Sequence, residues 1–224
     1  MIDVGFNLRE ITKRIPIDPK TLSAILLTHE HSDHLCGVGD FAREFSIPVY
    51  LPKSLYQVVA PKLDGVEIIA FSDGEMTIDG VTISSFRLPH DAVYTVGYKM
   101  EYGSESFAYL TDCGDFTNAV FNNIKGAQTI FIESNYDLDM LRGGKYPPII
   151  KARIESRLGH MSNDDCAKAV VDLAKKGTKK FILGHISENN NAPELAYDIV
   201  TKSLRDNGYD IPVFVASQRK VKLF

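Results

Sequence analysis

Short apolar runs, bounded by polar or turn-forming residues, recur along the chain and predict β-strands. Three of them are typical of buried strands: Ser23–His29, Thr129–Asn135 and Lys179–His185. The segment Met76–His90 contains Asp79-Gly80, a dipeptide that favours a two-residue hairpin turn. Two further runs, TVGYKMEY and SFAYLTD, lie on either side of Gly103 and predict a second pair of strands.

Segments whose apolar residues suit a helix lie between these strands. They are Asn7–Arg14, His34–Phe45, Lys53–Val59, Thr117–Ile124, Pro147–Ser156, Ser162–Lys176 and Pro193–Asp206. The start at Ser162 is the best marked, because SNDD is a capping-box pattern and an apolar stripe follows at helical spacing. Strand pairs early in the chain, with alternating helices and strands later, predict a layered α/β fold. A chain of 224 residues can form one domain with a real core, so we expect a single domain over residues 1–224.

Composition narrows the class of protein. The net charge of −4 argues against nucleic-acid binding, but two bound divalent cations would add about four positive charges and cancel it. Three widely spaced cysteines fit reduced thiols in the cytoplasm better than a disulfide framework. The chain has no long apolar run and its N-terminus does not resemble a signal peptide, so we expect no membrane span and no membrane partner.

The stretch LLTHEHSDHLCG carries the strongest chemical signal. His29, His31, Asp33 and His34 fall within six positions directly after a predicted strand. Four such side chains packed together would be poorly solvated or mutually repulsive without a cation. A lone histidine after a strand is usually an ordinary surface or core residue, but this cluster predicts a metal site.

Further metal-type side chains follow other predicted strands at their C-terminal ends, namely His90, Asp112 and His185. Those ends meet along one rim of a layered α/β sheet, where ligands usually bind. His29 and His31 alternate in an extended segment and can grip one ion, which His90 would complete. Asp33 and His34 can face a second ion with His185, and Asp112 would bridge the two. Imidazole and carboxylate suit zinc, manganese or iron.

The signature THEHSDH resembles that of the metallo-β-lactamase superfamily, and IDVG (Ile2–Gly5), His90, Asp112 and His185 match its remaining elements in order. The resemblance implies an αββα sandwich with a dinuclear metal site. The segments Glu133–Asn163 and Gly184–Ala196 resemble the WalJ/YycJ branch, which implies a 5′-to-3′ exonuclease acting on double-stranded DNA.

Departures from the family pattern refine this expectation. True β-lactamases carry a cysteine where Asp112 stands, and flavodiiron oxygen reductases carry a carboxylate where His31 stands. Neither drug hydrolysis nor that redox chemistry is therefore expected. The family also opens with two strands before the IDVG segment, where this chain starts. We therefore expect either a misassigned start codon or a sandwich that lacks these first strands and tolerates an open sheet edge.

The predicted chemistry is metal-dependent hydrolysis of a phosphodiester. A hydroxide held between two divalent ions is a strong nucleophile at neutral pH, and both ions stabilise the charge that develops during displacement. Asp33 and Asp112 are the carboxylates expected to take part in catalysis. By analogy with the family, Asp3 is expected to orient the ligand loop without binding metal.

His160 is the histidine left over from the metal set, and it lies in the motif LGHMSN. It could be a capping or surface residue. Similar Gly-His motifs in related nucleases hold the scissile phosphate, which implies a catalytic and substrate-binding role. Ser162, Asn163 and Arg157 would complete an anion site at the start of the following helix. Between Arg142 and Arg157 five basic residues face one acid, which suits a polyanion, although such a run is more often a solvated surface.

Two alternative functions remain open. One is a small-molecule hydrolase acting on thioesters, lactones or cyclic phosphodiesters, against which the basic run and GHMSN argue. The other is a metal-binding regulatory protein without catalysis, against which the complete ligand set argues. The sequence leaves the oligomeric state and the choice of metal open.

Overall fold

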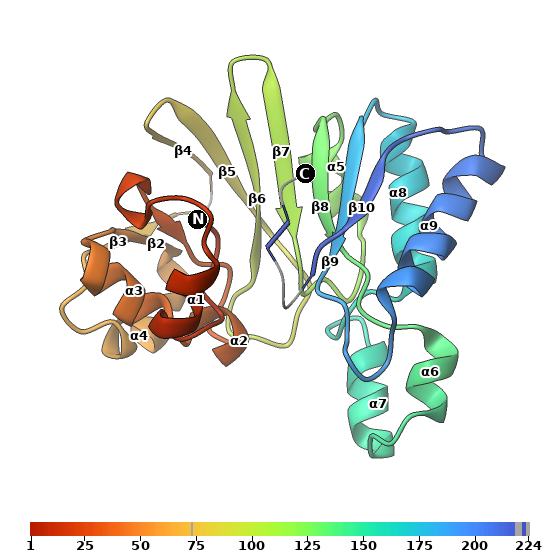
Figure 1. Cartoon of the computed structure of the whole chain (residues 1–224), viewed down its shortest axis with the longest axis horizontal. Helices are drawn as coiled ribbons and strands as arrows, with labels where there is room; N and C mark the ends of the chain where they lie inside the picture. The colour runs from red at the N-terminus through yellow and green to blue at the C-terminus, as the bar shows by residue number, and fades with distance from the viewer. Residues whose placement is uncertain (73, 218–220, 223–224) are drawn as a thin grey trace. The chain divides into compact units, whose positions relative to one another are not determined.

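The computed structural model describes residues 1–72, 74–217 and 221–222 (Figure 1). The chain divides into two compact units. The first comprises Met1–Ser85 and Ala92–Val96, and the second comprises Phe86–Asp91 and Gly97–Phe224. The expected single domain over residues 1–224 stays a prediction.

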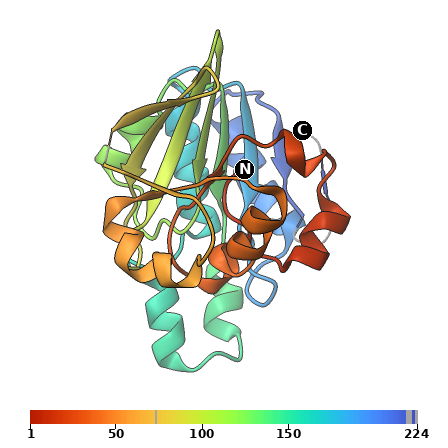
Figure 2. The same ribbon diagram turned by 90° about the vertical axis from the view of Figure 1, so that its left-hand side faces the viewer.

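The first unit contains a small parallel sheet with strand order β1-β2-β3. Its strands are β1 (Ile25–Leu26), β2 (Val49–Pro52) and β3 (Ile68–Phe71). Helical segments accompany them (Figure 2): α1 (Leu8–Arg14), α2 (Ser32–Leu35), α3 (Val38–Phe45) and α4 (Tyr56–Val59), with 3₁₀ turns at Pro19–Thr21, Lys53–Leu55 and Ala60–Lys62. Ile25, Val49 and Phe41 are fully buried in the core that these elements share.

The expected hairpin is present, formed by β4 (Glu75–Ile78) and β5 (Val81–Arg87). Asp79 and Gly80 both have positive φ, 47° and 80°, and Ile78 pairs with Val81 across the turn. Positive φ at both central residues defines a type I′ turn, whose twist matches that of the strands, and Asp-Gly is well suited to it. This prediction from the dipeptide is confirmed.

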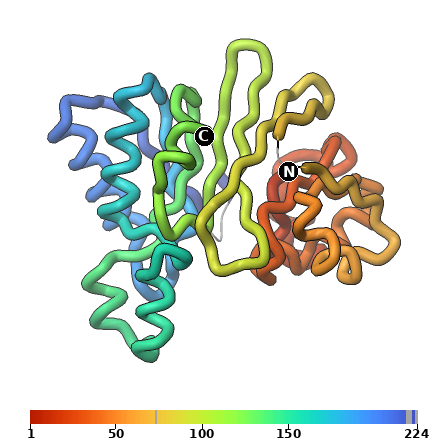
Figure 3. The backbone as a smooth tube through the Cα atoms, turned by 180° about the vertical axis from the view of Figure 1, so that it is seen from behind, coloured from red at the N-terminus to blue at the C-terminus, as the bar shows by residue number. Residues whose placement is uncertain are grey.

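In the second unit, five strands are neighbours in the order β10-β9-β8-β7-β6. They are β6 (Val96–Tyr102), β7 (Glu105–Leu110), β8 (Thr129–Glu133), β9 (Lys180–Gly184) and β10 (Val213–Val215). The accompanying helices α5 (Asn118–Ile124), α8 (Asn163–Ala174) and α9 (Pro193–Asp206) contribute to one core with these strands, and α8 and α9 lie side by side (Figures 1 and 3).

Three parallel strands bring polar residues to one edge of this sheet. The register aligns Leu110 of β7 with Ile132 of β8, and Ile132 with Leu183 of β9. All three strands therefore end at the same level, and Asp112, Glu133 and His185 follow one another along that edge. This is the geometry expected for ligand binding in parallel α/β sheets.

A helical hairpin separates β8 from α8 in sequence. Helices α6 (Leu138–Gly143) and α7 (Pro148–Glu155) project side by side beyond the sheet of their unit (Figure 1). Residues 156–160 then return the chain from α7 to the sheet edge.

The structure corrects some predicted elements. The helix expected over His34–Phe45 is two helices, α2 and α3, interrupted at Cys36-Gly37. The Gly37 amide donates to Val4 O, and a Cβ on Gly37 would lie 1.8 Å from Phe6 O. The close passage of the N-terminal segment therefore breaks the helix there. The short elements β2, β3, α6 and β10 were not predicted.

Two general expectations bear on the class of protein. The three cysteines are free, with Cys113 and Cys166 buried and Cys36 exposed. Among the described residues, no helix combines the length and the apolar character needed to span a membrane.

Candidate metal site

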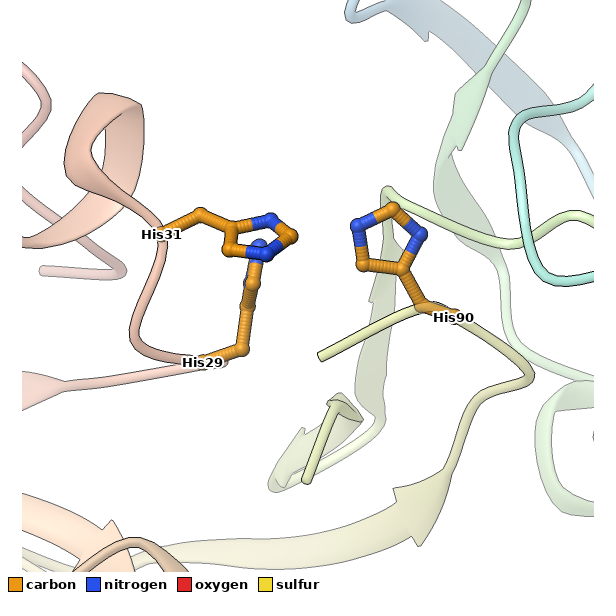
Figure 4. A group of neighbouring side chains, drawn as sticks. All are labelled: His29, His31 and His90. Carbon is orange, nitrogen blue, oxygen red and sulfur yellow. The ribbon is translucent and has the colours of Figure 1, made fainter. Parts of the chain in front are cut away.

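The first unit gathers the histidines of the THEHSDH signature. His29 and His31 lie in the segment after β1, with ring centroids 4.7 Å apart and an angle of 74° between the ring planes, an edge-on arrangement visible in Figure 4. His34, in α2, has its ring centroid 4.3 Å from that of His29. Asp33 is exposed, and its Oδ2 lies 3.7 Å from His34 Nε2. His29, His31, Asp33 and His34 therefore place nitrogen and oxygen donors in one small region of the first unit.

Asp3 connects the IDVG segment to this group. Its carboxylate accepts hydrogen bonds from Thr28 N at 2.8 Å, from Thr28 Oγ1 at 2.7 Å and from His34 Nδ1 at 2.7 Å. Thr28 Oγ1 also lies 2.9 Å from His29 Nδ1. Asp3 therefore holds the orientation of His34 directly and that of His29 through Thr28, which is the arrangement expected of a residue that orients metal ligands.

The second unit gathers His90, Asp112, His160 and His185. Asp112 is buried, and its Oδ1 lies 3.5 Å from His90 Nε2, 3.4 Å from His160 Nδ1 and 3.8 Å from His185 Nδ1. His90 follows β5 (Figure 4), and its Nδ1 donates to Gly159 O at 3.0 Å. One donor atom from each of Asp112, Glu133, His160 and His185 lies within 4.8 Å of the others.

Glu133 is a central residue of this second group that the sequence reasoning missed. It is fully buried, and its Oε1 accepts from His160 Nδ1 and from His185 Nδ1, both at 2.8 Å. Its Oε2 accepts from Cys113 N at 2.9 Å and from Met161 N at 3.3 Å. One carboxylate thus fixes two histidine rings with Nε2 as the nitrogen that can bind a cation.

These contacts set the charge of the buried groups. Burial acts to raise the pKa of Glu133, but the charges and hydrogen bonds of His160 and His185 outweigh it and lower that pKa to about 2. Burial acts to lower the pKa of His160, but Glu133 and Asp112 raise it above its ordinary value. Burial lowers the pKa of His90. Glu133 is therefore an anion at neutral pH and a strong acceptor for both rings.

Backbone strain is concentrated at this chemistry. Asp3, Asp112 and His185 have φ angles of 51°, 59° and 54°, a region that costs a non-glycine residue roughly 1–3 kcal/mol. Asp112 and His185 both follow strands of the sheet edge. The surrounding packing holds these residues in strained conformations, which is typical of functional sites.

The donor set fits divalent cations. Each group combines imidazole nitrogens with a carboxylate, the mixture that zinc, manganese and iron accept. Buried carboxylates that are not needed as ligands fix the Nδ1 atoms of His34 and His185, so that each ring presents Nε2. Such hydrogen bonds from Nδ1 to a carboxylate are typical of histidines that bind a metal through Nε2.

The predicted substrate residues differ in what they contact. Arg157 has an 85% exposed side chain and pairs with Asp115, with 2.7 Å between Arg157 Nε and Asp115 Oδ2. Ser162 accepts from Asp165 N, so its hydroxyl caps α8. Asn163 is 1% exposed, accepts from Ser134 Oγ and donates to Asn191 Oδ1. Ser162 and Asn163 therefore use their side chains to fix the start of α8.

Several residues that hold the site escaped the sequence reasoning. Besides Glu133 they are Thr28, Gly159 and Asn135, whose side chain donates to His185 O at 2.7 Å. Glu133 carried a usable signal, since it lies near the C-terminal end of the predicted strand Thr129–Asn135, where His185 lies in its own predicted strand. The others act through backbone atoms or small side chains, which leave no pattern in the sequence.

Residues 1–186 match the family model described as a beta-lactamase superfamily domain. The chain therefore belongs to the β-lactamase superfamily. The predicted superfamily and the α/β fold with helix-flanked sheets are confirmed by this match and by the solved structures that resemble the chain.

Within that superfamily, the chain is 34% identical over 218 residues to the protein named exodeoxyribonuclease YycJ of Bacillus anthracis, covering 94% of this chain and 83% of that protein. It is 36% identical over 213 residues to exodeoxyribonuclease WalJ of Streptococcus pneumoniae serotype 2, covering 91% of this chain and 79% of the other. The predicted WalJ/YycJ branch is therefore confirmed.

Solved structures share the fold at lower identity. Zinc-bound PqqB from Methylobacterium extorquens superimposes with a TM-score of 0.72 at 20% identity, over 96% of this chain and 80% of PqqB. Human tRNase Z, short form, gives a TM-score of 0.65 at 14% identity, over 96% of this chain and 84% of that chain. These likenesses establish the architecture.

Proposed function

We propose that the protein is a dinuclear metal-dependent phosphodiesterase that degrades DNA as a 5′-to-3′ exonuclease. The observation that carries the proposal is the pair of donor groups, each braced by a buried carboxylate, in a chain 34–36% identical to exodeoxyribonucleases. Relatives named as nucleases also favour an enzyme over the alternative of a non-catalytic metal-binding protein.

Seven residues would hold two divalent ions, with zinc or manganese as the first choices and iron as the third. His29, His31 and His90 would bind one ion, Asp33, His34 and His185 the other, and Asp112 both. Such a centre supplies Lewis acidity and an activated water for attack on phosphorus.

The chain's own residues around this centre would bind and orient the phosphodiester. His160, with its pKa raised and its Nδ1 held by Glu133, would present Nε2–H to a phosphate oxygen. Arg157, which is exposed and pairs with Asp115, would contact a neighbouring phosphate. Ser162 and Asn163 would act indirectly, by fixing the segment that carries His160.

A DNA substrate also bears on where the enzyme works. The exodeoxyribonucleases that it resembles come from bacteria, in which DNA lies in the cytoplasm. A cytoplasmic location is therefore part of this proposal.

The experiment that tests the proposal is a nuclease assay on end-labelled duplexes that carry either a 5′-phosphate or a 5′-hydroxyl. The purified protein, supplemented with manganese or zinc, is expected to release nucleotides progressively from the 5′ end. An inactive control is the Asp112→Ala variant. Intact DNA after incubation, together with hydrolysis of a thioester, a lactone or a cyclic phosphodiester, would establish the small-molecule alternative instead.

A further inference from the structure

One face of α7 is exposed along its whole length. Helix α7 has eight residues and buries none of them. Residues at positions i, i+3, i+4 and i+7 share one side of a helix. Three exposed residues of α7, Ile149, Ala152 and Arg153, lie on one side, and the exposed C-cap residue Ser156 follows them. Ile149 is 77% exposed, more than any other large apolar residue in the described part of the chain. We name these four residues, with Arg157 and Leu158 after them, the α7 track.

Polar contacts fix the position of the hairpin. Lys151 Nζ donates to Arg142 O at 2.7 Å, which ties α7 to α6. Arg142 forms an ion pair with Glu155 at 3.2 Å. Asn189 Nδ2 donates to Tyr146 OH at 2.9 Å, which ties the hairpin to the loop after His185. The hairpin thus has a defined position. On its outer face, Arg153 pairs with Asp91 and Arg157 with Asp115, while Ile149 stays exposed.

The hairpin is positively charged within an acidic chain. Five basic residues and one acid lie between Arg142 and Arg157, whereas the whole chain carries a net charge of −4. Three of the five are arginines that pair with acids, and the two others are Lys145 and Lys151. Neither lysine forms an ion pair within the described residues, but Lys151 Nζ is held by Arg142 O on another side of α7 than Ile149. The exposed Lys145 is therefore the cation available to an anionic partner.

The α7 track leads directly to the candidate site. Leu158 and Arg157 are followed by Gly159 and His160, and His160 N donates to Ile154 O at 3.0 Å. Gly159 O accepts from His90 Nδ1, and a Cβ on Gly159 would lie 2.2 Å from Ile154 O. The end of α7 is therefore packed tightly against two histidines of the second donor group.

We propose that the α7 track guides a DNA strand to His160, with Ile149 against the bases and Lys145, in the loop directly before α7, against a phosphate. This inference rests on the proposed function. Ile149 to Ser156 spans about 10 Å, because a helix rises about 1.5 Å per residue. That length matches about three nucleotide steps along one strand. The positive charge favours DNA over a protein partner, and the small side chains of Ala152 and Ser156 permit close approach of a backbone.

Two charge-introducing variants, Ile149→Glu and Lys145→Glu, test the α7 track. Matched controls are Ile17→Glu, at an isoleucine that is 49% exposed in the first unit, and Lys176→Glu, at an exposed lysine after α8. Binding is measured by fluorescence anisotropy with manganese-loaded protein and a duplex whose 5′-terminal linkages are phosphorothioates. Melting temperatures establish that each variant is folded.

Ile149→Glu and Lys145→Glu are each expected to raise the Kd for the duplex about tenfold, while the controls stay within about twofold of the unaltered protein. The Lys145→Glu variant should also lower the dependence of log Kd on log salt concentration by about one. If these two variants and the controls bind alike, or if the unaltered protein does not bind the duplex, the α7 track is not a DNA guide. If binding depends on the α7 track but DNA without phosphorothioates is not cleaved, the proposed exonuclease activity is wrong, whereas the DNA-binding role of the α7 track is retained.

Discussion

Asp3 and Glu133 each hold a histidine through Nδ1, at 2.7 Å to His34 and 2.8 Å to His185. The two acids lie in different units of the chain and use the same chemistry. A histidine whose Nδ1 is fixed by a carboxylate has one tautomer and one ring orientation, and its Nε2 becomes more basic. At the scale of single residues, the site therefore depends on acids that need not touch a metal.

Replacing Glu133 by glutamine tests this bracing. Glutamine replaces one acceptor oxygen of Glu133 by an NH₂ donor. In one orientation this NH₂ faces the donors Cys113 N and Met161 N, and in the other it faces the Nδ1–H groups of His160 and His185. At least one contact is lost in either orientation. We expect metal affinity or activity to fall by about 10–100-fold. Metal content after dialysis, measured by elemental analysis, checks this. The control Glu101→Gln, at a 48% exposed acid, should retain full metal content.

His160 and Asp112 should separate substrate binding from metal binding. The variant His160→Ala is expected to lose activity by about 10²-fold or more, as for the removal of one transition-state hydrogen bond, and to keep its metal. The variant Asp112→Ala is expected to lose both. Turnover on DNA and metal content are measured on the same preparations. Loss of metal from His160→Ala would show that His160 is a ligand, and full activity of Asp112→Ala would exclude its bridging role.

The ends of helices and strands set the positions of the candidate site residues. Helix α8 starts at Ser162, two residues after His160, and the Ser162 hydroxyl accepts from Asp165 N at 3.1 Å. Strands β7 and β9 end just before Asp112 and His185. These boundaries followed from the sequence, because capping residues and the ends of apolar runs are local signals.

The variant Ser162→Ala should reveal the role of the cap. Without the hydroxyl, Asp165 N loses its acceptor, and the free energy of unfolding should fall by about 1 kcal/mol. Urea denaturation followed by circular dichroism measures this. The control Ser203→Ala replaces a serine inside α9 by a better helix former and should leave stability unchanged or slightly higher. Equal stabilities of the two variants would contradict the capping role.

Other elements escaped prediction for physical reasons. Strands β2 and β3 have four residues each and β10 has three, too few for a periodic pattern to stand out. The break between α2 and α3 depends on Phe6 and Val4 passing over Gly37, a contact distant in sequence. The helix propensity of the residues themselves carries no information about such a contact.

At the scale of the whole molecule, metal binding should stabilise the fold. A ligand set assembled from separated segments exists only in the folded chain, so bound metal adds its binding free energy to folding. At a free metal concentration of about 100 times Kd, the gain is about 2.7 kcal/mol, or roughly 5–10 °C in melting temperature for a chain of this size. Differential scanning fluorimetry with EDTA and then with manganese or zinc measures it. The same melting temperature in both conditions would argue against metal binding at this site.

The sequence by itself predicted the donor residues, and it determined the superfamily and the strand ends that carry Asp112 and His185, because these depend on residue type and local pattern. Only the tertiary structure decided which donors share a unit, that Glu133 holds two histidines, and that Asn163 is buried rather than presented to a ligand. The physical reason is that orientation and burial arise from contacts between residues far apart in the chain. His160 and Glu133, for example, are 27 positions apart and meet only when α7 returns the chain to the sheet edge.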